Sequence, residues 1–203
     1  MDRNILGYLF IILKIWQNTN RERMMYVKYC MHCGKQLSTK YIEKEGDVAH
    51  CVACDTLFFP QFNTAVSMIV LNPAKDQILL IQQYGKQRNV LVAGYVNQKE
   101  DVEETLIREM KEEIGRNICA FKYLKSEYFV RSNTLMLSFA VVLDDMNLDF
   151  VDQDEIDCAQ WFSFEKAKKE IAKDSLAERF LNHFIQVYHD DFFEEHDKIQ
   201  INT

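Results

Sequence analysis

Proline and glycine are scarce in this chain of 203 residues, which has only 2 Pro and 6 Gly. This scarcity excludes collagen-like, linker-rich and low-complexity chains, because each of those classes depends on these residues. Long hydrophobic runs are also lacking. The apolar stretch Ile5–Leu13 is too short to span a bilayer, and no small-residue cleavage site follows it. We therefore expect a cytoplasmic protein without a stable membrane span, and we hypothesise that translation starts at Met24 or Met25.

Positive charge is in deficit as well, because 24 Lys and Arg face 31 Asp and Glu and leave a formal net charge of −7. Unspecific binding to nucleic acid is therefore not expected, since affinity for phosphate backbones comes mainly from basic side chains. The charges are unevenly distributed. Residues 1–40 have a net charge of +5 and residues 94–115 one of −4, while residues 144–157 hold seven carboxylates and no basic residue. A solvated face explains any one acidic run, unless a motif beside it requires negative charge.

Four of the six cysteines form two Cys-x-x-Cys pairs with 17 residues between them: Cys30, Cys33, Cys51 and Cys54. This spacing is typical of a four-thiolate zinc site, although a disulfide framework would compete with it in a secreted protein. Four thiolates leave no open coordination position, so we predict a structural Zn²⁺ that stabilises a small ribbon. His50 is an alternative ligand to one of the thiolates. The other two cysteines, Cys119 and Cys158, are expected to be buried as small hydrophobes.

Strand and helix signals follow the cysteine pairs in mixed order. Apolar runs indicate strands, and apolar residues at three- and four-residue steps indicate helices. The expected strands are Ala65–Leu71, Asp76–Gln83, Leu135–Leu143 and Ala159–Phe162, with a further short apolar run at Asn89–Ala93, and the expected helices are Glu100–Ile114, Phe164–Ile171 and Ser175–His189. The first two strands are separated by an Asn-Pro turn and should form a hairpin. The mixed order predicts an α+β fold or an α/β/α sandwich.

The helix expected at Glu100–Ile114 carries a cluster of acids. Glu109, Glu112 and Glu113 stand at i, i+3 and i+4, hence on one face of a helix, where like charges repel one another. Mg²⁺ or Mn²⁺ would offset this repulsion, because these cations accept carboxylate oxygens and bridge the phosphates of a substrate. Arg108 could orient one carboxylate through a bidentate pair. The pattern therefore predicts a divalent-cation site for a phosphate-containing substrate.

Residues 94–115 resemble the Nudix box, Gly-x5-Glu-x7-Arg-Glu-U-x-Glu-Glu-x-Gly-U, in which U is an aliphatic residue. The fixed glycine and polar positions are filled by Gly94, Glu100, Arg108, Glu109, Glu112, Glu113 and Gly115. Arg116 stands at the last aliphatic position, and Lys99 stands where related enzymes often have glycine. Gly115 directly after the expected helix is typical of a C′ residue.

The segments on both sides resemble the NADH pyrophosphatase branch of that family. A four-cysteine ribbon and the run Phe58-Phe59-Pro60 precede the box, and Glu155 begins a segment similar to the branch's Glu-Ile-x-x-Ala-x-Trp-Phe element, whose Glu is a metal ligand. The specificity signature of the branch, expected at 126–134, matches only at Ser126. The resemblance implies hydrolysis of a dinucleotide or NAD(H)-like pyrophosphate to a nucleoside monophosphate. The alternatives are an ADP-ribose or nucleotide-sugar pyrophosphatase, a hydrolase of capped RNA ends, and a non-catalytic nucleotide-binding regulator.

The resemblance also implies a domain organisation and a set of partners. The expected segments are an N-terminal extension at 1–24, a zinc ribbon at 25–61, a Nudix α/β/α sandwich with a mixed sheet at 62–192, and an acidic tail at 193–203. The expected partner is a small-molecule nucleotide, and a capped end is the only form of nucleic acid expected. Because related enzymes commonly dimerise, a homodimer is expected.

Roles for individual residues follow from the same match. The implied ligands of Mg²⁺ or Mn²⁺ are Glu109, Glu112, Glu113 and Glu155, together with the backbone carbonyl of Ala93 or Gly94. Arg108 would position the carboxylates, and the general base stays open between Glu109 and a distal acid such as Glu155. Tyr128, Phe129 and Arg131 are candidates for stacking on a base or gripping a phosphate, and ordinary packing is the alternative for all three.

Overall fold

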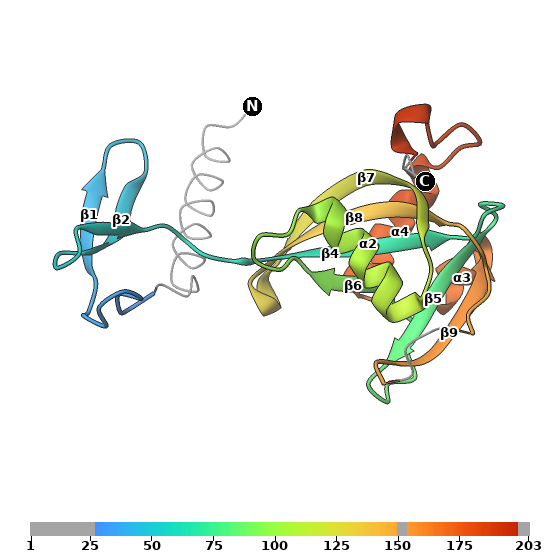
Figure 1. Cartoon of the computed structure of the whole chain (residues 1–203), viewed down its shortest axis with the longest axis horizontal. Coiled ribbons are helices and arrows are strands. Elements are labelled where there is room, and N and C mark those ends of the chain that lie inside the picture. The colour runs from blue at the N-terminus through green and yellow to red at the C-terminus, as the bar shows by residue number, and fades with distance from the viewer. Residues whose placement is uncertain (1–26, 150–153, 199–203) are drawn as a thin grey trace, which may run out of the picture. The chain divides into compact units, whose positions relative to one another are not determined.

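The computed structural model describes residues 27–149 and 154–198 (Figure 1). Residue contacts divide the chain into two compact units, with the boundary between Gln61 and Phe62. The expected N-terminal extension, with its apolar stretch Ile5–Leu13 and the hypothesised start at Met24 or Met25, lies outside the described residues. Within the described part of the chain, no helix is long and apolar enough to cross a bilayer.

The first unit is a three-stranded antiparallel ribbon. Its strands are β1 (Ser38–Ile42), β2 (Gly46–Cys51) and β3 (Thr56–Phe58), with β2 in the middle. Among the described residues of the ribbon, the buried cluster contains Cys30, Cys51 and Phe58, with two partly buried neighbours. So few apolar side chains supply little hydrophobic stabilisation, which gives the cysteine cluster described below a structural task.

The second unit is built on a mixed sheet. The strands lie in the order β7 (Ile118–Phe129), β8 (Thr134–Leu143), β4 (Asn63–Leu71), β5 (Gln77–Gln83) and β9 (Ile156–Ser163), and β6 (Val92–Tyr95) also pairs with β4. Strands β4 and β8 are parallel, and every other named pair in this sheet is antiparallel. The predicted mixed sheet is therefore confirmed.

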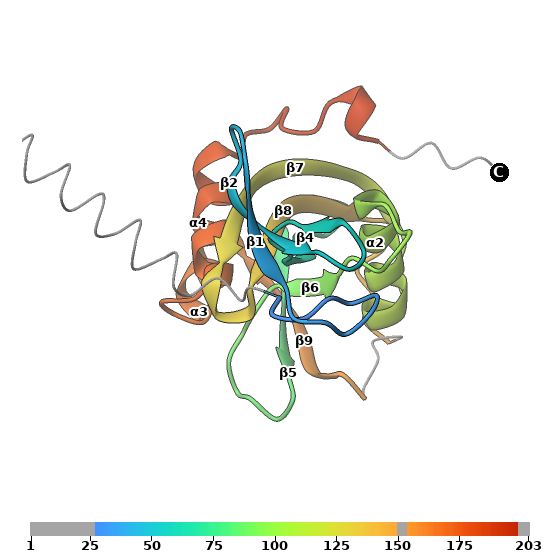
Figure 2. The same ribbon diagram turned by 90° about the vertical axis from the view of Figure 1, so that its left-hand side faces the viewer.

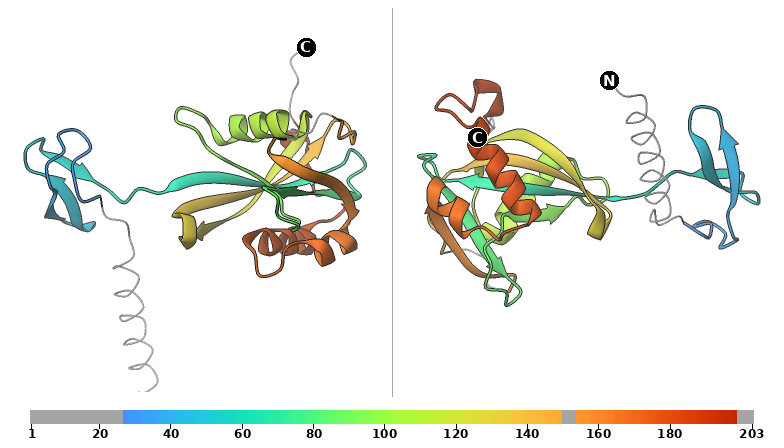
Figure 3. Two further views of the ribbon diagram at one scale, coloured as in Figure 1. Left: turned by 90° about the horizontal axis from the view of Figure 1, so that it is seen from below. Right: turned by 180° about the vertical axis from the view of Figure 1, so that it is seen from behind.

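Helices cover both faces of this sheet, as Figure 2 shows from one side and Figure 3 from below and behind. Alternate residues of β4 enter two separate cores, because successive side chains of a strand point to opposite faces. Ile69 packs with Phe180 and Phe184 of α4 (Leu176–Val187), on the side of α3 (Phe164–Glu170). Met68 packs in the other core with Leu106 of α2 (Val102–Glu109). The unit is thus an α/β/α sandwich.

The expected acidic helix begins and ends close to its predicted bounds, but its last turn is π-helical instead of α-helical. Asp101 caps α2 in a reciprocal capping box with Glu104, which places the start two residues after Glu100. From Met110 to Ile114 the chain continues as a π-helical turn, η1, and Gly115 ends it in the left-handed region with φ of 70°. The C′ role expected for Gly115 is confirmed, whereas the sequence pattern contains no signal for the π turn.

Two expectations need correction. No strand was expected between 118 and 127, yet β7 is a long strand there and pairs with β8 along its whole length. Burial was expected for the two isolated cysteines, but Cys158 is exposed and Cys119 is only half-buried. Both residues lie on strands that have a solvent-facing side, so alternation along the strand overrides the general preference of cysteine for burial.

Residues 192–198 contact the sheet. The Lys122 ammonium group on β7 donates to the Phe192 carbonyl at 2.9 Å and to the Asp197 carboxylate at 3.2 Å. Both Phe192 and Asp197 are buried. The described part of the expected acidic tail is thus held against β7.

Candidate active site

Arg108 is the centre of a polar network on α2. Its guanidinium group binds Glu100 in bidentate fashion, with Nε–Oε1 and Nη2–Oε2 distances of 2.6 and 3.0 Å. The Nη1 group donates to Glu109 at 2.7 Å and to Glu112 at 3.1 Å, and Nη2 also donates to the Tyr95 carbonyl at 3.0 Å. Hydrogen bonds from Arg108 and from a backbone N–H hold the pKa of Glu100 at about 2. One cation therefore orders three carboxylates.

Glu109 is packed directly against Gly94. A Cβ atom on Gly94 would overlap Cγ, Cδ and Oε1 of the Glu109 side chain, so only glycine leaves room for this carboxylate. Glu109 is 8% exposed, and its burial raises the pKa of the carboxyl group although Arg108 opposes this change. Gly94 pairs with Val66 of β4, which places the glycine over the middle of the sheet. The first and the fourth fixed residue of the motif are thus in direct contact.

Tyr84 is influenced by the negative charges of several carboxylates. Partial burial and the negative charges of Glu155, Glu113 and Glu109 raise the pKa of the Tyr84 hydroxyl group. Glu113 is 5% exposed, and Glu155 is an exposed residue just before β9. The negative charges of three carboxylates from different elements therefore act on one side chain. Sequence reasoning missed Tyr84, because its relation to these acids arises only from pairing between β5 and β9.

The three glutamates of the box do not share one exposed face. Glu109 and Glu113 are buried, whereas 62% of the Glu112 side chain is exposed and its carboxylate contacts Arg108. The residues from Met110 onward follow π rather than α winding, which changes the direction of each side chain relative to the expected helical face. Among the described residues, the four cysteines are the only group of three or more potential ligands whose atoms all lie within 4.8 Å of one another. The carboxylate oxygens lie further apart.

A pocket of about 300 Å³ adjoins this acidic region. Its lining residues come from five elements and the loop after β5: Ser67, Gln83, Tyr84, Lys86, Arg88, Val90, Leu91, Ala93, Met136, Leu176 and Ala177. Ala93 pairs with Ser67 and lines the pocket, while the next residue, Gly94, contacts Glu109. The pocket and the Glu109 carboxylate therefore lie on the two sides of β6, and Tyr84, which lines the pocket, is influenced by the charge of Glu109. Of the pocket residues, only Ala93 was predicted as a site residue from the sequence.

The three residues expected to bind the substrate lie elsewhere, at the end of the β7–β8 hairpin. The Tyr128 hydroxyl group donates to the Asn133 side chain, and its ring packs edge-on against Phe62 at 6.2 Å. Phe129 is half-buried, and Arg131 is exposed in the short turn η2 (Val130–Ser132). All three residues lie outside the lining of the pocket beside Tyr84.

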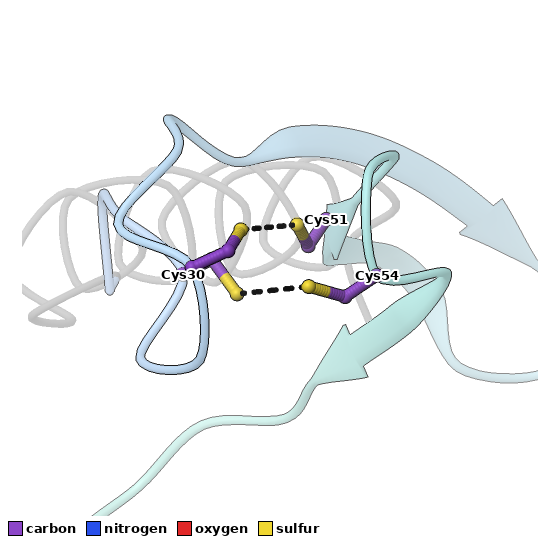
Figure 4. Close-up of side chains that lie close together, drawn as sticks. Cys30, Cys51 and Cys54 are labelled. Atoms are coloured by element: carbon purple, nitrogen blue, oxygen red, sulfur yellow. Dashed lines mark hydrogen bonds between the residues drawn. The ribbon is translucent and has the colours of Figure 1, made fainter.

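The four predicted cysteines meet at one point of the ribbon (Figure 4). The Sγ atoms of Cys30 and Cys54 lie 3.9 Å apart and those of Cys33 and Cys51 lie 3.6 Å apart, so all four thiols are free. Burial opposes ionisation of Cys30, but hydrogen bonds from backbone N–H groups lower its pKa to about 6. His50 is not part of the cluster, since its Nε2 atom contacts Asp55 at 3.0 Å. The cluster could hold a metal ion.

The α/β/α sandwich and its acidic helix define a class of protein. The family model "NUDIX domain" matches residues 61–184, and the chain belongs to this family, whose members are hydrolases. A crystal structure of a Nudix hydrolase from Nitrosomonas europaea superposes with a TM-score of 0.60 and 17% identity, covering 79% of this chain and 91% of that one. At this identity the likeness concerns the fold.

Curated relatives are similar over more of the chain. The NAD-capped RNA hydrolase NudC of Pseudomonas aeruginosa is 31% identical over 187 residues, which cover 91% of this chain and 60% of NudC. The NAD-capped RNA hydrolase ndx-9 of Caenorhabditis elegans is 26% identical over 172 residues, covering 83% of this chain and 43% of ndx-9. The chain thus spans about 60% of the length of NudC. The resemblance to the NADH pyrophosphatase branch is confirmed by these relatives.

Proposed function

We propose that this protein hydrolyses the pyrophosphate bond of a dinucleotide or NAD(H)-like compound and releases a nucleoside monophosphate. The observation that carries the proposal is the packing of Glu109 against Gly94, with Arg108 fixing its carboxylate. A buried acid held in one position beside an open pocket is costly for the fold, and such arrangements are concentrated at catalytic sites. Membership in the Nudix family and the similarity to NudC support the same reaction.

The donor set fits a hard divalent cation. Carboxylate and carbonyl oxygens are the ligands that Mg²⁺ and Mn²⁺ prefer, and Mg²⁺ commonly keeps several waters instead of requiring a closed protein cage. We assign the ligands to Glu109, Glu112, Glu113, Glu155 and the carbonyl of Ala93 or Gly94. A bound cation would neutralise phosphate charge and lower the pKa of the attacking water.

The residues of the chain have separate tasks in this reaction. Arg108 holds Glu109 and Glu112 in place, and Glu100 in turn fixes Arg108 through its bidentate pair. Glu109 or Glu155 would accept the proton of the attacking water, since the charges of both act on the same side chain, Tyr84. The pocket beside Ala93 would hold one nucleoside half of the substrate.

A substrate panel tests this proposal. The full chain is incubated with Mg²⁺ or Mn²⁺ and NADH, ADP-ribose, dinucleoside polyphosphates or NAD-capped RNA, and the nucleoside monophosphate is quantified. We expect turnover of a dinucleotide that Glu113→Gln reduces by about 10²-fold or more, because a carboxylate ligand is lost without a change of shape. Turnover of no substrate, or full activity of Glu113→Gln, would contradict the assignment.

A second candidate function is removal of an NAD cap from RNA. The names of the curated relatives favour it, because both the bacterial and the nematode proteins are NAD-capped RNA hydrolases. The same panel separates this function from the first: a short capped RNA should then be cleaved with a higher kcat/KM than free NADH. ADP-ribose or nucleotide-sugar hydrolysis would appear as a preference for ADP-ribose.

We further propose that the ribbon binds a structural Zn²⁺. In a tetrahedral zinc site with Zn–S bonds of about 2.3 Å, two sulfur atoms are about 3.8 Å apart. The separations of 3.6 and 3.9 Å within the cluster support this geometry. We also propose that residues 25–61 form the zinc ribbon and residues 62–192 the catalytic domain. The expected homodimer and cytoplasmic location stay predictions, and light scattering of the purified chain tests the dimer.

A further inference from the structure

Two basic side chains line the pocket beside Tyr84 without a partner among the described residues. Lys86 and Arg88 stand on the loop between β5 and β6 and line the pocket. Among the described residues, neither side chain has an ion pair or a hydrogen bond. In contrast, Arg108, Arg116 and Arg179 each contact a carboxylate. Two unpaired cations in one pocket of an acidic protein therefore call for an anionic ligand.

The loop that carries them is anchored. Gly85 N–H donates to the Asp157 carboxylate at 2.7 Å, which ties the loop to β9. Tyr84 and Gly85 both have positive φ, at 56° and 68°, so the chain turns sharply there. The carboxylate of Asp157 is engaged in this backbone bond, while the ammonium and guanidinium groups of Lys86 and Arg88 stay exposed. The two cations are thus presented from a loop that is fixed to the sheet.

The rest of the pocket matches one half of a dinucleotide. Its volume of about 300 Å³ is at the lower end of small-molecule sites, so it would take a nucleoside but not a whole dinucleotide. Met136 and Leu176 supply apolar walls and Tyr84 an aromatic side chain, which suit the face of a base. The scissile pyrophosphate has to reach the Glu109 carboxylate, which lies across β6 from the pocket. Lys86 and Arg88 are therefore available to bind an anionic group other than the scissile pyrophosphate.

We propose that Lys86 and Arg88 bind a further phosphate ester on the ribose of the substrate, so that the preferred substrate class is a dinucleotide pyrophosphate with a phosphorylated ribose. This inference rests on the proposed pyrophosphatase function and specifies its substrate. A 2′-phosphate, as in NADPH, and a 3′-phosphodiester, as in an NAD-capped RNA, offer the same charge at the ribose. Arginine suits such a group because its planar donors match phosphate oxygens.

Binding of product analogues tests the proposal independently of turnover. Titration calorimetry compares AMP with adenosine 2′,5′-bisphosphate and adenosine 3′,5′-bisphosphate on the full chain. We expect one bisphosphate to bind at least about tenfold more tightly than AMP, the gain typical of charge-assisted hydrogen bonds. Preference for the 2′,5′ isomer identifies a phosphorylated free dinucleotide, and preference for the 3′,5′ isomer identifies the RNA linkage. Equal affinity of all three ligands would overturn the proposal.

Matched variants locate the effect. The double variant Lys86→Gln/Arg88→Gln should abolish the preference for a bisphosphate and lower kcat/KM for the phosphorylated substrate about tenfold, with less than about a threefold change for NADH. The control is Lys168→Gln/Lys169→Gln, which removes two exposed charges from α3, outside the pocket. Equal losses for NADH and NADPH in the double variant would mean that the two cations bind the scissile pyrophosphate. That result would overturn this inference and leave the pyrophosphatase function standing, whereas absence of all turnover would contradict that function alone.

Discussion

Substitution of Gly94 by alanine tests the central contact of the candidate site. The new Cβ atom would overlap Cγ, Cδ and Oε1 of Glu109. Because ordinary carbon contacts are about 3.5–4.0 Å long, the Glu109 side chain must move by roughly 1 Å or more. The backbone of Gly94 lies in a strand and has no positive φ, so alanine fits the main chain itself. The perturbation therefore acts on the carboxylate and on its bond to Arg108.

The expected effect on activity exceeds the effect on stability. A displacement of about 1 Å at a catalytic group commonly costs about 10²-fold in rate, equivalent to about 2.7 kcal/mol of transition-state stabilisation. The free energy of unfolding should fall by only about 1 kcal/mol, the lower end of the range for overpacking, because the obstructing atoms belong to a flexible side chain. Steady-state kcat/KM on the substrate found in the panel and urea unfolding of the same samples measure the two quantities.

A double-mutant cycle identifies the cause. In a Glu109→Ala background the obstructing side chain is absent, so Gly94→Ala should change the free energy of unfolding by less than about 0.5 kcal/mol. If Gly94→Ala alone keeps activity within about twofold of the native protein, Glu109 does not depend on this contact and the reasoning fails. An equal loss of stability in both backgrounds would show that the alanine disturbs the strand itself.

Three further predictions concern the acids and the ribbon. Glu113→Gln should lower kcat by about 10²-fold or more with little change in melting temperature, whereas Glu103→Gln at an exposed position of the preceding α2 should leave both unchanged. Because Arg108 holds the pKa of Glu100 at about 2, below its ordinary value of 4.5, this residue stabilises the fold above pH 4.5 and loses its effect as the pH falls towards 2. The deficit of Glu100→Gln in urea unfolding should therefore shrink from pH 7 to pH 3, and a constant deficit would contradict the pairing. Removal of zinc by a chelator should accelerate hydrogen exchange in residues 27–61 and leave the sheet of the second unit protected, and unchanged exchange in the ribbon would refute a structural metal.

The hairpin and the two C-terminal helices could be predicted because their signals are local. Asn72 closes the β4–β5 turn by accepting from the backbone N–H groups of Asp76 and Gln77 at 3.0 and 3.1 Å. Ser175 caps α4 by accepting from the Glu178 N–H group. Each of these signals lies within five residues of its partner, so it can be read without knowledge of the fold.

Two residues, Lys99 and Arg116, depart from the Nudix pattern, and only the structure shows what each of them does. Lys99 has a φ of 70°, so the position where relatives often have glycine requires a left-handed backbone. Arg116, at an aliphatic position of the pattern, donates to the Asn147 carbonyl at 2.6 Å and holds the acidic segment that follows β8. The family pattern did not predict the contact between Arg116 and Asn147, because this contact depends on the path of a distant segment of the chain.

The sequence by itself determined the family of the protein and the residues of its cysteine cluster. The spacing of four cysteines and of the acids and glycines in residues 94–115 was sufficient to predict a metal-binding ribbon and a Nudix fold, since these ligands lie close together along the chain. Only the tertiary structure decided where a substrate fits. Ser67, Met136 and Leu176 meet in one pocket from distant parts of the chain, because β4 pairs with β8 in parallel and α4 packs beneath them. Such long-range pairing has no periodic or local signature, and it brings these residues together with Tyr84, Lys86 and Arg88 in one pocket.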